Sequence, residues 1–234
     1  MQNEELRMQN YIEAHSFLKE SANFYKLIEN AVKFIEPIEF PSIEECQKLV
    51  EDGLPILQHE NFQIKINEAV KKNSAQVLNS LKEINLQNET IERIIKQTII
   101  EKLIPNELKI SDVWDKWLKN YCPICGRKPV LAQLRKQNEG RARYLKCGGC
   151  STMWRWNRLG CVYCDNEDLY KMHILESAEE PQMRIDVCDE CKSYLKTYNE
   201  EGDEKIYLND WLTIHFDLLA EEENFHKVGS ILLE

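Results

Sequence analysis

Four Cys-x-x-Cys pairs lie close together in the second half of this 234-residue chain and constrain its fold more than any other feature. The pairs are Cys122/Cys125, Cys147/Cys150, Cys161/Cys164 and Cys188/Cys191. They are separated by 21, 10 and 23 residues, so the outer gaps are nearly equal and the middle gap is short. This spacing favours a duplicated unit in which two consecutive pairs bind one ion through four thiolates. The sequence therefore predicts two separate tetrathiolate metal sites.

Each pair is expected to form a turn that holds two sulfurs about 2.3 Å from one ion, with backbone N–H groups pointing at the sulfurs. The residue after the second cysteine often needs a positive φ, which Gly126 accepts without steric cost. The Asp165-Asn166 segment is expected to serve the same purpose after the third pair, because Asn tolerates that conformation better than most residues. No such argument applies to Ser151 or Lys192, which follow the other two pairs.

The cysteine pattern also has other interpretations. A thioredoxin-like dithiol uses one such pair at the start of a helix, which four regularly spaced pairs do not resemble. Cross-braced sites, built from the first and third and from the second and fourth pairs, fit the count but ignore the near-equal outer gaps. An iron–sulfur cluster takes four cysteines in more crowded runs. Spacing does not choose between zinc and iron, since both accept four thiolates.

The chain carries no sign of an enzyme. A closed tetrathiolate site leaves no position for water or substrate, which argues against metal-assisted catalysis. No glycine-rich phosphate loop occurs. The histidines show no triad or ligand spacing, and we expect surface or capping roles for them: His15, His59, His173, His215 and His226.

Composition places the chain among soluble proteins with a true core, since 43% of its residues are hydrophobic and 30% are charged. No apolar run approaches the roughly 20 residues that span a bilayer, and residues 1–10 lack a signal-peptide pattern. We therefore expect a cytoplasmic protein, where reducing conditions disfavour disulfides. Cys46 lies outside the pairs and is expected to be a small buried apolar residue.

The first 125 residues are predicted to be helical, because Gly53 is their one glycine and no proline lies between Pro55 and Pro105. Ser42 and Glu45 form a capping-box pattern at the head of a helix over 43–51, and Gly53 follows its end. Two stripes at helical spacing are expected to face the core of a bundle: Ile66, Val70, Val77, Leu81 and Ile84, then, after a break at 85–88, Ile91, Ile94, Ile95, Ile99 and Leu103.

Two further features are expected to join the metal region to the helices. Trp114 and Trp117 directly precede the first cysteine pair and are predicted to dock that region on the helical part. A last amphipathic helix over roughly 209–223, which includes Phe216 and Leu219, is predicted to pack back on the body.

The two cysteine units differ in charge. Seven Lys or Arg stand against one acid between Cys122 and Cys150, whereas nine acids stand against two bases between Cys161 and Cys191. Part of the basic excess offsets the formal charge of a tetrathiolate site. The rest, interleaved with aromatic residues, is compatible with nucleic-acid binding. The net charge of −10 disfavours that function, so a protein-binding surface is the preferred interpretation.

Several segments around the pairs form a recognisable set. They read Cys-Pro-Ile-Cys-Gly at 122–126, Arg-Tyr-Leu-Lys-Cys at 143–147, Arg-Leu-Gly-Cys at 158–161 and Val-Cys-Asp-Glu-Cys-Lys-Ser-Tyr-Leu-Lys at 187–196. Together they resemble the FdhE family of formate dehydrogenase accessory proteins. Residues 51–57 resemble that family's Glu-Gly-x-Pro-Leu-Leu segment, and 209–217 resemble its C-terminal helix. Gly148-Gly149 inside the second pair departs from the usual filling.

The resemblance implies a mainly α N-terminal helical domain, two small rubredoxin-like or zinc-ribbon modules with four cysteines each, and a C-terminal helix that packs on the body. We place these parts at residues 1–118, 119–157, 158–200 and 201–234. It also implies a cytoplasmic, non-catalytic factor that binds the catalytic subunit of formate dehydrogenase during maturation, without membrane insertion. The two mononuclear tetrathiolate ions would be iron or zinc. Partner contacts are expected from Arg143, Tyr144, Arg158 and Tyr194.

Three other functions stay open at this point. A rubredoxin-like redox protein would cycle iron by one electron and act on the partner enzyme. A zinc-ribbon protein would bind nucleic acid through the basic strip at 135–158. A metal-stabilised adaptor of an unrelated target also fits the sequence.

Overall fold

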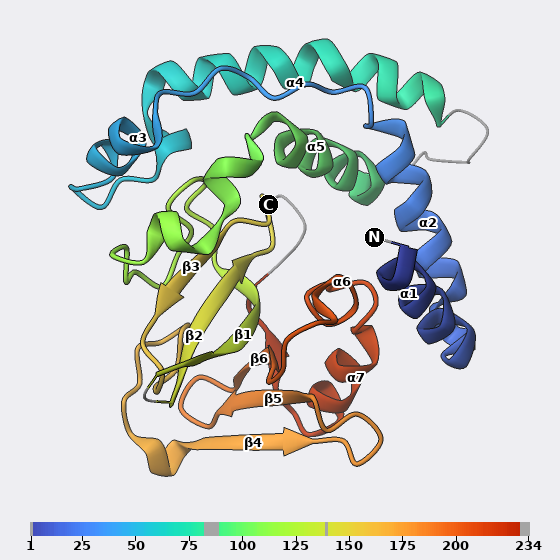
Figure 1. Cartoon of the computed structure of the whole chain (residues 1–234), viewed down its shortest axis with the longest axis vertical. Coiled ribbons are helices and arrows are strands. Elements are labelled where there is room, and N and C mark those ends of the chain that lie inside the picture. The colour runs from blue at the N-terminus through green and yellow to red at the C-terminus, as the bar shows by residue number, and fades with distance from the viewer. Residues whose placement is uncertain (1, 82–88, 139, 230–234) are drawn as a thin grey trace.

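A computed structural model of the chain describes residues 2–81, 89–138 and 140–229. Helices occupy the described part of the first half, and one seven-stranded sheet occupies most of the second half (Figure 1). The long helix α4 lies across the top of the view with α5 beneath it, and the sheet lies below them. None of the helices in these ranges is both long and apolar enough to cross a membrane.

The helical half forms its own core from α2, α4 and α5. Its helices are α1 Gln2–Ala14, α2 Lys19–Ala31, α3 Ile43–Leu49, α4 Glu60–Ser80 and α5 Glu89–Leu103. The two predicted apolar stripes meet in this core, where Ile66, Val70, Val77 and Leu81 pack with Ile95, Ile99 and Leu103. The prediction of core-facing stripes is thus confirmed for these residues, while Ile84, the break at 85–88 and the side chain of Ile91 lie outside what the structure describes.

The capping box at α3 is confirmed. The Ser42 hydroxyl accepts a hydrogen bond from the backbone N–H of Glu45, and the Glu45 carboxylate accepts one from the backbone N–H of Ser42. The helix ends at Leu49, two residues before the predicted end, and Gly53 has a φ of +86° in the following turn. Cys46 is fully buried as expected. Burial raises the pKa of its thiol to about 11, so it remains a thiol at neutral pH.

The sheet joins both cysteine units. Its strands are β1 Pro129–Gln137, β2 Gly140–Cys147, β3 Met153–Trp156, β4 Met172–Glu176, β5 Met183–Cys188, β6 Ser193–Tyr198 and β7 His226–Lys227. The strand order is β3-β2-β1-β6-β5-β4, with β7 also paired to β6. Each unit contributes three antiparallel strands, and the units meet where β1 and β6 run parallel, with Leu131 opposite Lys196.

The expectation of two small, separate modules therefore needs correction, because the sheet is continuous and substantial. If the units were separate, β1 and β6 would each present a row of unpaired backbone N–H and C=O groups. Pairing the two edges satisfies these groups and fuses the units. The Cys-x-x-Cys spacing reports the duplication but contains no information on this pairing.

The C-terminal segment also differs from the predicted single helix over 209–223. A short helix, α6 Glu204–Tyr207, comes first, and α7 starts only at Ile214 and ends at Glu222. Between them, the Asn209 side chain accepts a hydrogen bond from the Trp211 backbone N–H at 3.0 Å. Such a local bond favours a turn over a helix. Helix α7 packs on β5 and β6, as the predicted return to the body requires.

Candidate metal centres

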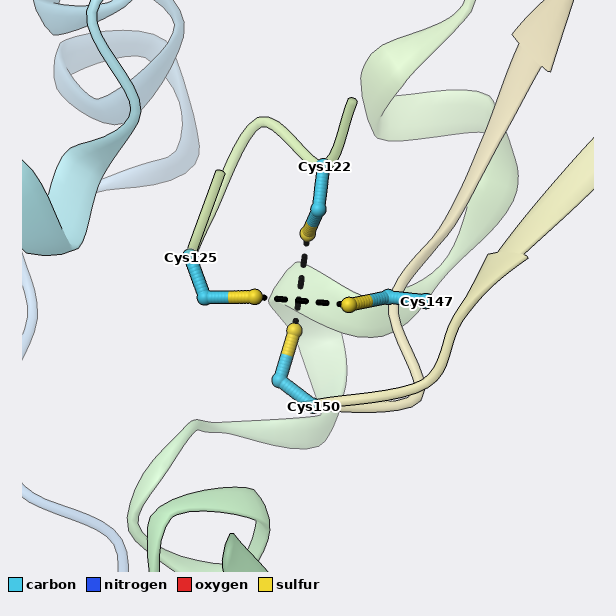
Figure 2. A group of neighbouring side chains, drawn as sticks. All are labelled: Cys122, Cys125, Cys147 and Cys150. Atoms are coloured by element: carbon cyan, nitrogen blue, oxygen red, sulfur yellow. Dashed lines mark hydrogen bonds between the residues drawn. The ribbon is translucent and has the colours of Figure 1, made fainter. Parts of the chain in front are cut away.

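The first two cysteine pairs converge on one point (Figure 2). The Sγ atoms of Cys122 and Cys150 lie 3.5 Å apart, and those of Cys125 and Cys147 lie 3.3 Å apart. Four sulfurs that each lie about 2.3 Å from a tetrahedral ion are about 3.8 Å from one another. None of the nine cysteines is in a disulfide, and the sulfur–sulfur distances are those of a metal cage.

The last two pairs form a second cluster of the same kind. The Sγ atoms of Cys161 and Cys191 lie 3.7 Å apart, and those of Cys164 and Cys188 lie 3.8 Å apart. The four candidate ligand atoms in each cluster are all within 4.8 Å of one another. The structure thus groups the pairs consecutively, as the near-equal outer gaps favour, and not in a cross-braced manner.

Equivalent elements deliver the cysteines in both units. In each unit one pair lies in the loop before the first strand and the other pair begins at the end of the second strand. Cys147 is the last residue of β2, and Cys188 is the last residue of β5. Each cluster therefore fastens the end of a hairpin to the loop that precedes it.

All four pairs share one backbone conformation. The residue after the second cysteine has a positive φ in every case: Gly126 at 79°, Ser151 at 59°, Asp165 at 57° and Lys192 at 55°. The sequence predicted this for Gly126 and for the 165–166 segment but not for Ser151 or Lys192. The missed signal was positional, because both residues occupy the same place in the repeat as Gly126. The geometry of the cysteine turn thus imposes a positive φ at this position even on residues whose Cβ disfavours it.

In each cluster one hydroxyl group lies within hydrogen-bond distance of a cysteine sulfur, and neither hydroxyl was predicted from the sequence. The Thr152 hydroxyl lies 3.1 Å from the Cys150 sulfur, and the Ser193 hydroxyl lies 2.9 Å from the Cys191 sulfur. Both follow the second cysteine of a pair by two residues, so the repeat contained this signal. A backbone N–H also donates to sulfur, from Gly149 to Cys147 at 3.2 Å.

Burial and mutual hydrogen bonds shift the pKa values of Cys122 and Cys150 in opposite directions. Burial raises the pKa of the Cys122 thiol well above its usual value, and hydrogen bonds with the other three cysteines raise it further. Burial also opposes ionisation of Cys150, but hydrogen bonds from the other three cysteines and from Thr152 outweigh it and hold that pKa well below its usual value. Metal binding by the four cysteines requires their thiol protons to leave.

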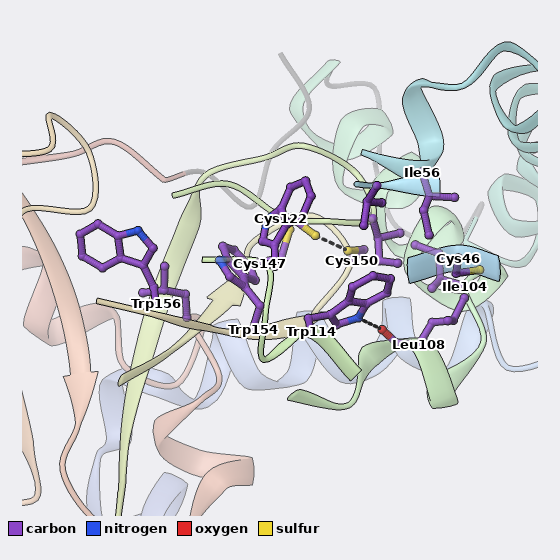
Figure 3. Close-up of a cluster of buried hydrophobic side chains, with 14 of the residues drawn as sticks. Cys46, Ile56, Ile104, Leu108, Trp114, Cys122, Cys147, Cys150, Trp154 and Trp156 are labelled. Carbon is purple, nitrogen blue, oxygen red and sulfur yellow. Dashed lines mark hydrogen bonds between the residues drawn. The ribbon is translucent and has the colours of Figure 1, made fainter. Parts of the chain in front are cut away.

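The first cluster lies in the core between the helices and the sheet (Figure 3). Trp114 and Trp154 pack there with Ile56 and Ile104 from the helical half. Backbone N–H groups of Ile56 and Leu57 donate to the carbonyl oxygens of residues 123 and 124, inside the first cysteine turn. Trp117 is in the same core, so both tryptophans occupy the junction that the sequence predicted for them.

The second cluster lies nearer the surface. Cys164 is exposed and Cys191 is half-buried, whereas in the first cluster only Cys125 is not fully buried. The two centres are therefore alike in geometry but different in solvent access.

Three of the four residues expected to contact a partner are buried. Arg143 donates to the carbonyl oxygens of Asn157 at 2.8 Å and of Gly160 at 2.9 Å. Tyr144 is 5% exposed and Tyr194 is 2% exposed. Arg158 is exposed, and it lies in the 157–160 loop that Arg143 holds.

The basic strip does not form a continuous surface either. Arg143 is buried, and the Lys146 ammonium donates to the Leu208 carbonyl oxygen at 2.5 Å. Arg135 stacks on the Tyr144 ring at 4.5 Å. These three cations make contacts within the fold, so they do not add to an exposed basic surface.

Comparisons with known proteins agree on one family. Residues 121–158 match the FdhE central domain, and residues 159–233 match the FdhE C-terminal domain. The chain is 33% identical over 123 residues to a protein FdhE homolog from Aquifex aeolicus, covering 51% of this chain and 44% of that relative. It is 31% identical over 112 residues to a homolog from Haemophilus influenzae, covering 47% and 37%. The matched part thus spans less than half the length of these relatives.

A solved structure extends the similarity beyond this part. The crystal structure of the FdhE protein from Pseudomonas aeruginosa aligns with a TM-score of 0.58 over 93% of this chain and 88% of that one. At 19% identity, this match shows a shared fold.

Proposed function

Because the chain belongs to the FdhE family, we propose that it is a non-catalytic accessory factor that binds the catalytic subunit of a formate dehydrogenase in the cytoplasm during maturation. The observation that supports this most is the presence of both four-cysteine clusters inside the segments that match the FdhE domains. Four thiolates on one ion leave no position for a substrate, which favours a structural role over a catalytic one.

The eight paired cysteines are the proposed ligands of two ions, iron or zinc. Binding of such an ion supplies folding free energy, on the order of 10 kcal/mol per site. In the first unit the ion would hold the β2 end against a loop that is hydrogen-bonded to the helical half. We propose that the chain divides into four parts, at residues 1–118, 119–157, 158–200 and 201–234. The border after residue 157 separates the two cysteine units, which share one sheet.

The partner surface is proposed to lie beside the second cluster. Large apolar side chains are exposed on the segments next to it: Leu159 at 59%, Leu169 at 52%, Tyr170 at 94% and Ile174 at 50%. Exposed apolar groups of this kind are typical of protein-binding surfaces. Arg158 adds a cation beside Leu159, and the buried Arg143 fixes the loop that carries both.

The test is affinity capture from an extract of the native host, with the full chain as bait. We expect recovery of the formate dehydrogenase catalytic subunit by the wild type and reduced recovery by a Leu159→Ala/Tyr170→Ala variant. Leu6→Ala is the matched control, because Leu6 on α1 is exposed to a similar extent, 57%, as Leu159. Failure of the wild-type bait to recover any formate dehydrogenase subunit would overturn the proposal.

A further inference from the structure

Three potential metal ligands from distant parts of the chain meet outside the cysteine clusters. His15 follows α1, Glu180 lies between β4 and β5, and His215 is in the first turn of α7. One ligand atom from each residue lies within 4.8 Å of the other two. The Nε2 atom of His215 is 2.6 Å from Oε2 of Glu180, and Nε2 of His15 is 3.8 Å from the same oxygen. Nothing in the spacing of these residues along the chain indicates this meeting.

The hydrogen bonds around His15 orient it as a ligand. Its Nδ1 lies 2.9 Å from the backbone carbonyl oxygen of Tyr11. A carbonyl oxygen only accepts, so Nδ1 carries a proton, and in the neutral ring Nε2, which faces Glu180, is the nitrogen with the free lone pair. Metal-binding histidines commonly donate their second ring N–H to a backbone carbonyl in this way.

Tyr11 also orients the carboxylate. Its hydroxyl donates to Oε1 of Glu180 at 2.8 Å, which leaves Oε2 facing the two imidazole rings. The rings of His15 and His215 stack with centroids 5.5 Å apart, and the Phe17 ring lies edge-on to both. The Glu180 side chain is only 9% exposed, so the carboxylate is largely removed from water.

We propose that His15, Glu180 and His215 form a third, cysteine-free site for a divalent ion of the zinc class. Two imidazole nitrogens and one carboxylate oxygen are a donor set that zinc accepts, with a fourth position left for water. The ion would replace the hydrogen bond between His215 and Glu180, so these two atoms would separate on binding. Because the ligands come from both ends of the chain, the ion would fasten α1 to α7 and to the β4–β5 connection.

The experiment uses the full chain with both cysteine clusters filled with zinc, titrated with Zn²⁺ by calorimetry and separately with Co²⁺. We expect one further equivalent to bind, and the added Co²⁺ to give weak d–d absorption without thiolate charge-transfer bands. His215→Gln is expected to abolish this equivalent, whereas His226→Gln, which changes an exposed histidine, should not. Tyr11→Phe keeps all three ligands and is expected to weaken the affinity about 10–100-fold.

Two results would overturn the proposal. One is the absence of a further equivalent in the wild type, and the other is unchanged binding in His215→Gln or, where that variant does not fold, in Tyr11→Phe. Tyr11→Phe removes one hydroxyl, so it keeps the test decisive if His215→Gln does not fold. None of these readouts involves formate dehydrogenase, so they are independent of the proposed function.

Discussion

Among the buried charges of the sheet, we expect removal of the Lys196 ammonium to lower the free energy of unfolding the most. Its side chain is fully buried on β6, and its ammonium lies 2.7 Å from Asp210 and 2.9 Å from Asp217. It also donates to the Thr213 carbonyl oxygen at 3.2 Å. Lys227 approaches the same two carboxylates at 2.8 and 3.1 Å, so two cations balance two anions.

Lys196→Met removes one cation and leaves two buried carboxylates with Lys227 as their remaining cationic partner. Breaking a buried ion pair on one side costs about 3–5 kcal/mol, because an uncompensated charge stays buried. We therefore expect the free energy of unfolding to fall by about that amount. The assay is urea unfolding followed by far-ultraviolet circular dichroism on metal-loaded protein.

Two variants make this prediction specific. Arg93→Met removes the exposed i,i+4 pair with Glu89 and should cost about 0.3–0.5 kcal/mol. Lys196→Met/Asp217→Asn restores charge balance, so its cost should be less than the sum of the single costs by about 1–3 kcal/mol. Two results would show that Lys196 is not part of a coupled buried ion-pair network. One is a Lys196→Met cost below about 1 kcal/mol, as for an exposed pair, and the other is a double-variant cost equal to the sum of the two single costs.

Three further predictions concern the clusters and the buried charges. Cys188→Ser should lose one equivalent of metal and much of a binding energy on the order of 10 kcal/mol, whereas Cys46→Ser should keep both ions; equal melting curves would contradict the ligand assignment. Burial opposes ionisation of Asp210, but Lys196 and Lys227 outweigh it and lower its pKa, so its stabilisation is present above about pH 4 and is lost as the pH falls through the lowered value. In urea unfolding, Asp210→Asn should therefore have a lower free energy of unfolding than the wild type at pH 7, and this difference should shrink toward pH 2. A difference that does not change with pH would show that ionisation of Asp210 does not stabilise the fold. Ser151→Gly should stabilise the chain by about 0.5 kcal/mol, since the roughly 1–2 kcal/mol relieved at a positive φ exceeds the entropic cost of glycine; a lower unfolding midpoint would show that the Ser151 backbone is not strained.

The sequence was informative wherever a local pattern determines structure. Helical periodicity located the faces of α4 and α5, and Ser42 with Glu45 located the start of α3. The cysteine gaps predicted which pairs share a cluster. In each case the residues that carry the signal are close together in the chain or repeat regularly.

The sequence was silent where distant segments meet. The parallel pairing of β1 with β6 fused two expected modules into one sheet, and nothing local to either strand encodes that partner. The meeting of His15 with His215 depends on the same three-dimensional arrangement. Charge counts also misled, because Arg143 and Lys146 look like surface cations in the sequence but are hydrogen-bonded within the fold.

X-ray absorption at the metal edge, with elemental analysis of the same sample, would show whether the eight paired cysteines hold two separate ions. The protein should be purified from its native host, so that the ion reflects its own cell. Two thiolate-bound ions per chain should give eight sulfur neighbours per chain at about 2.3 Å, and an ion held by His15, Glu180 and His215 would add only nitrogen and oxygen neighbours. Fewer than eight sulfur neighbours per chain, a metal–metal distance typical of a cluster, or cysteines recovered as disulfides would exclude two separate tetrathiolate sites.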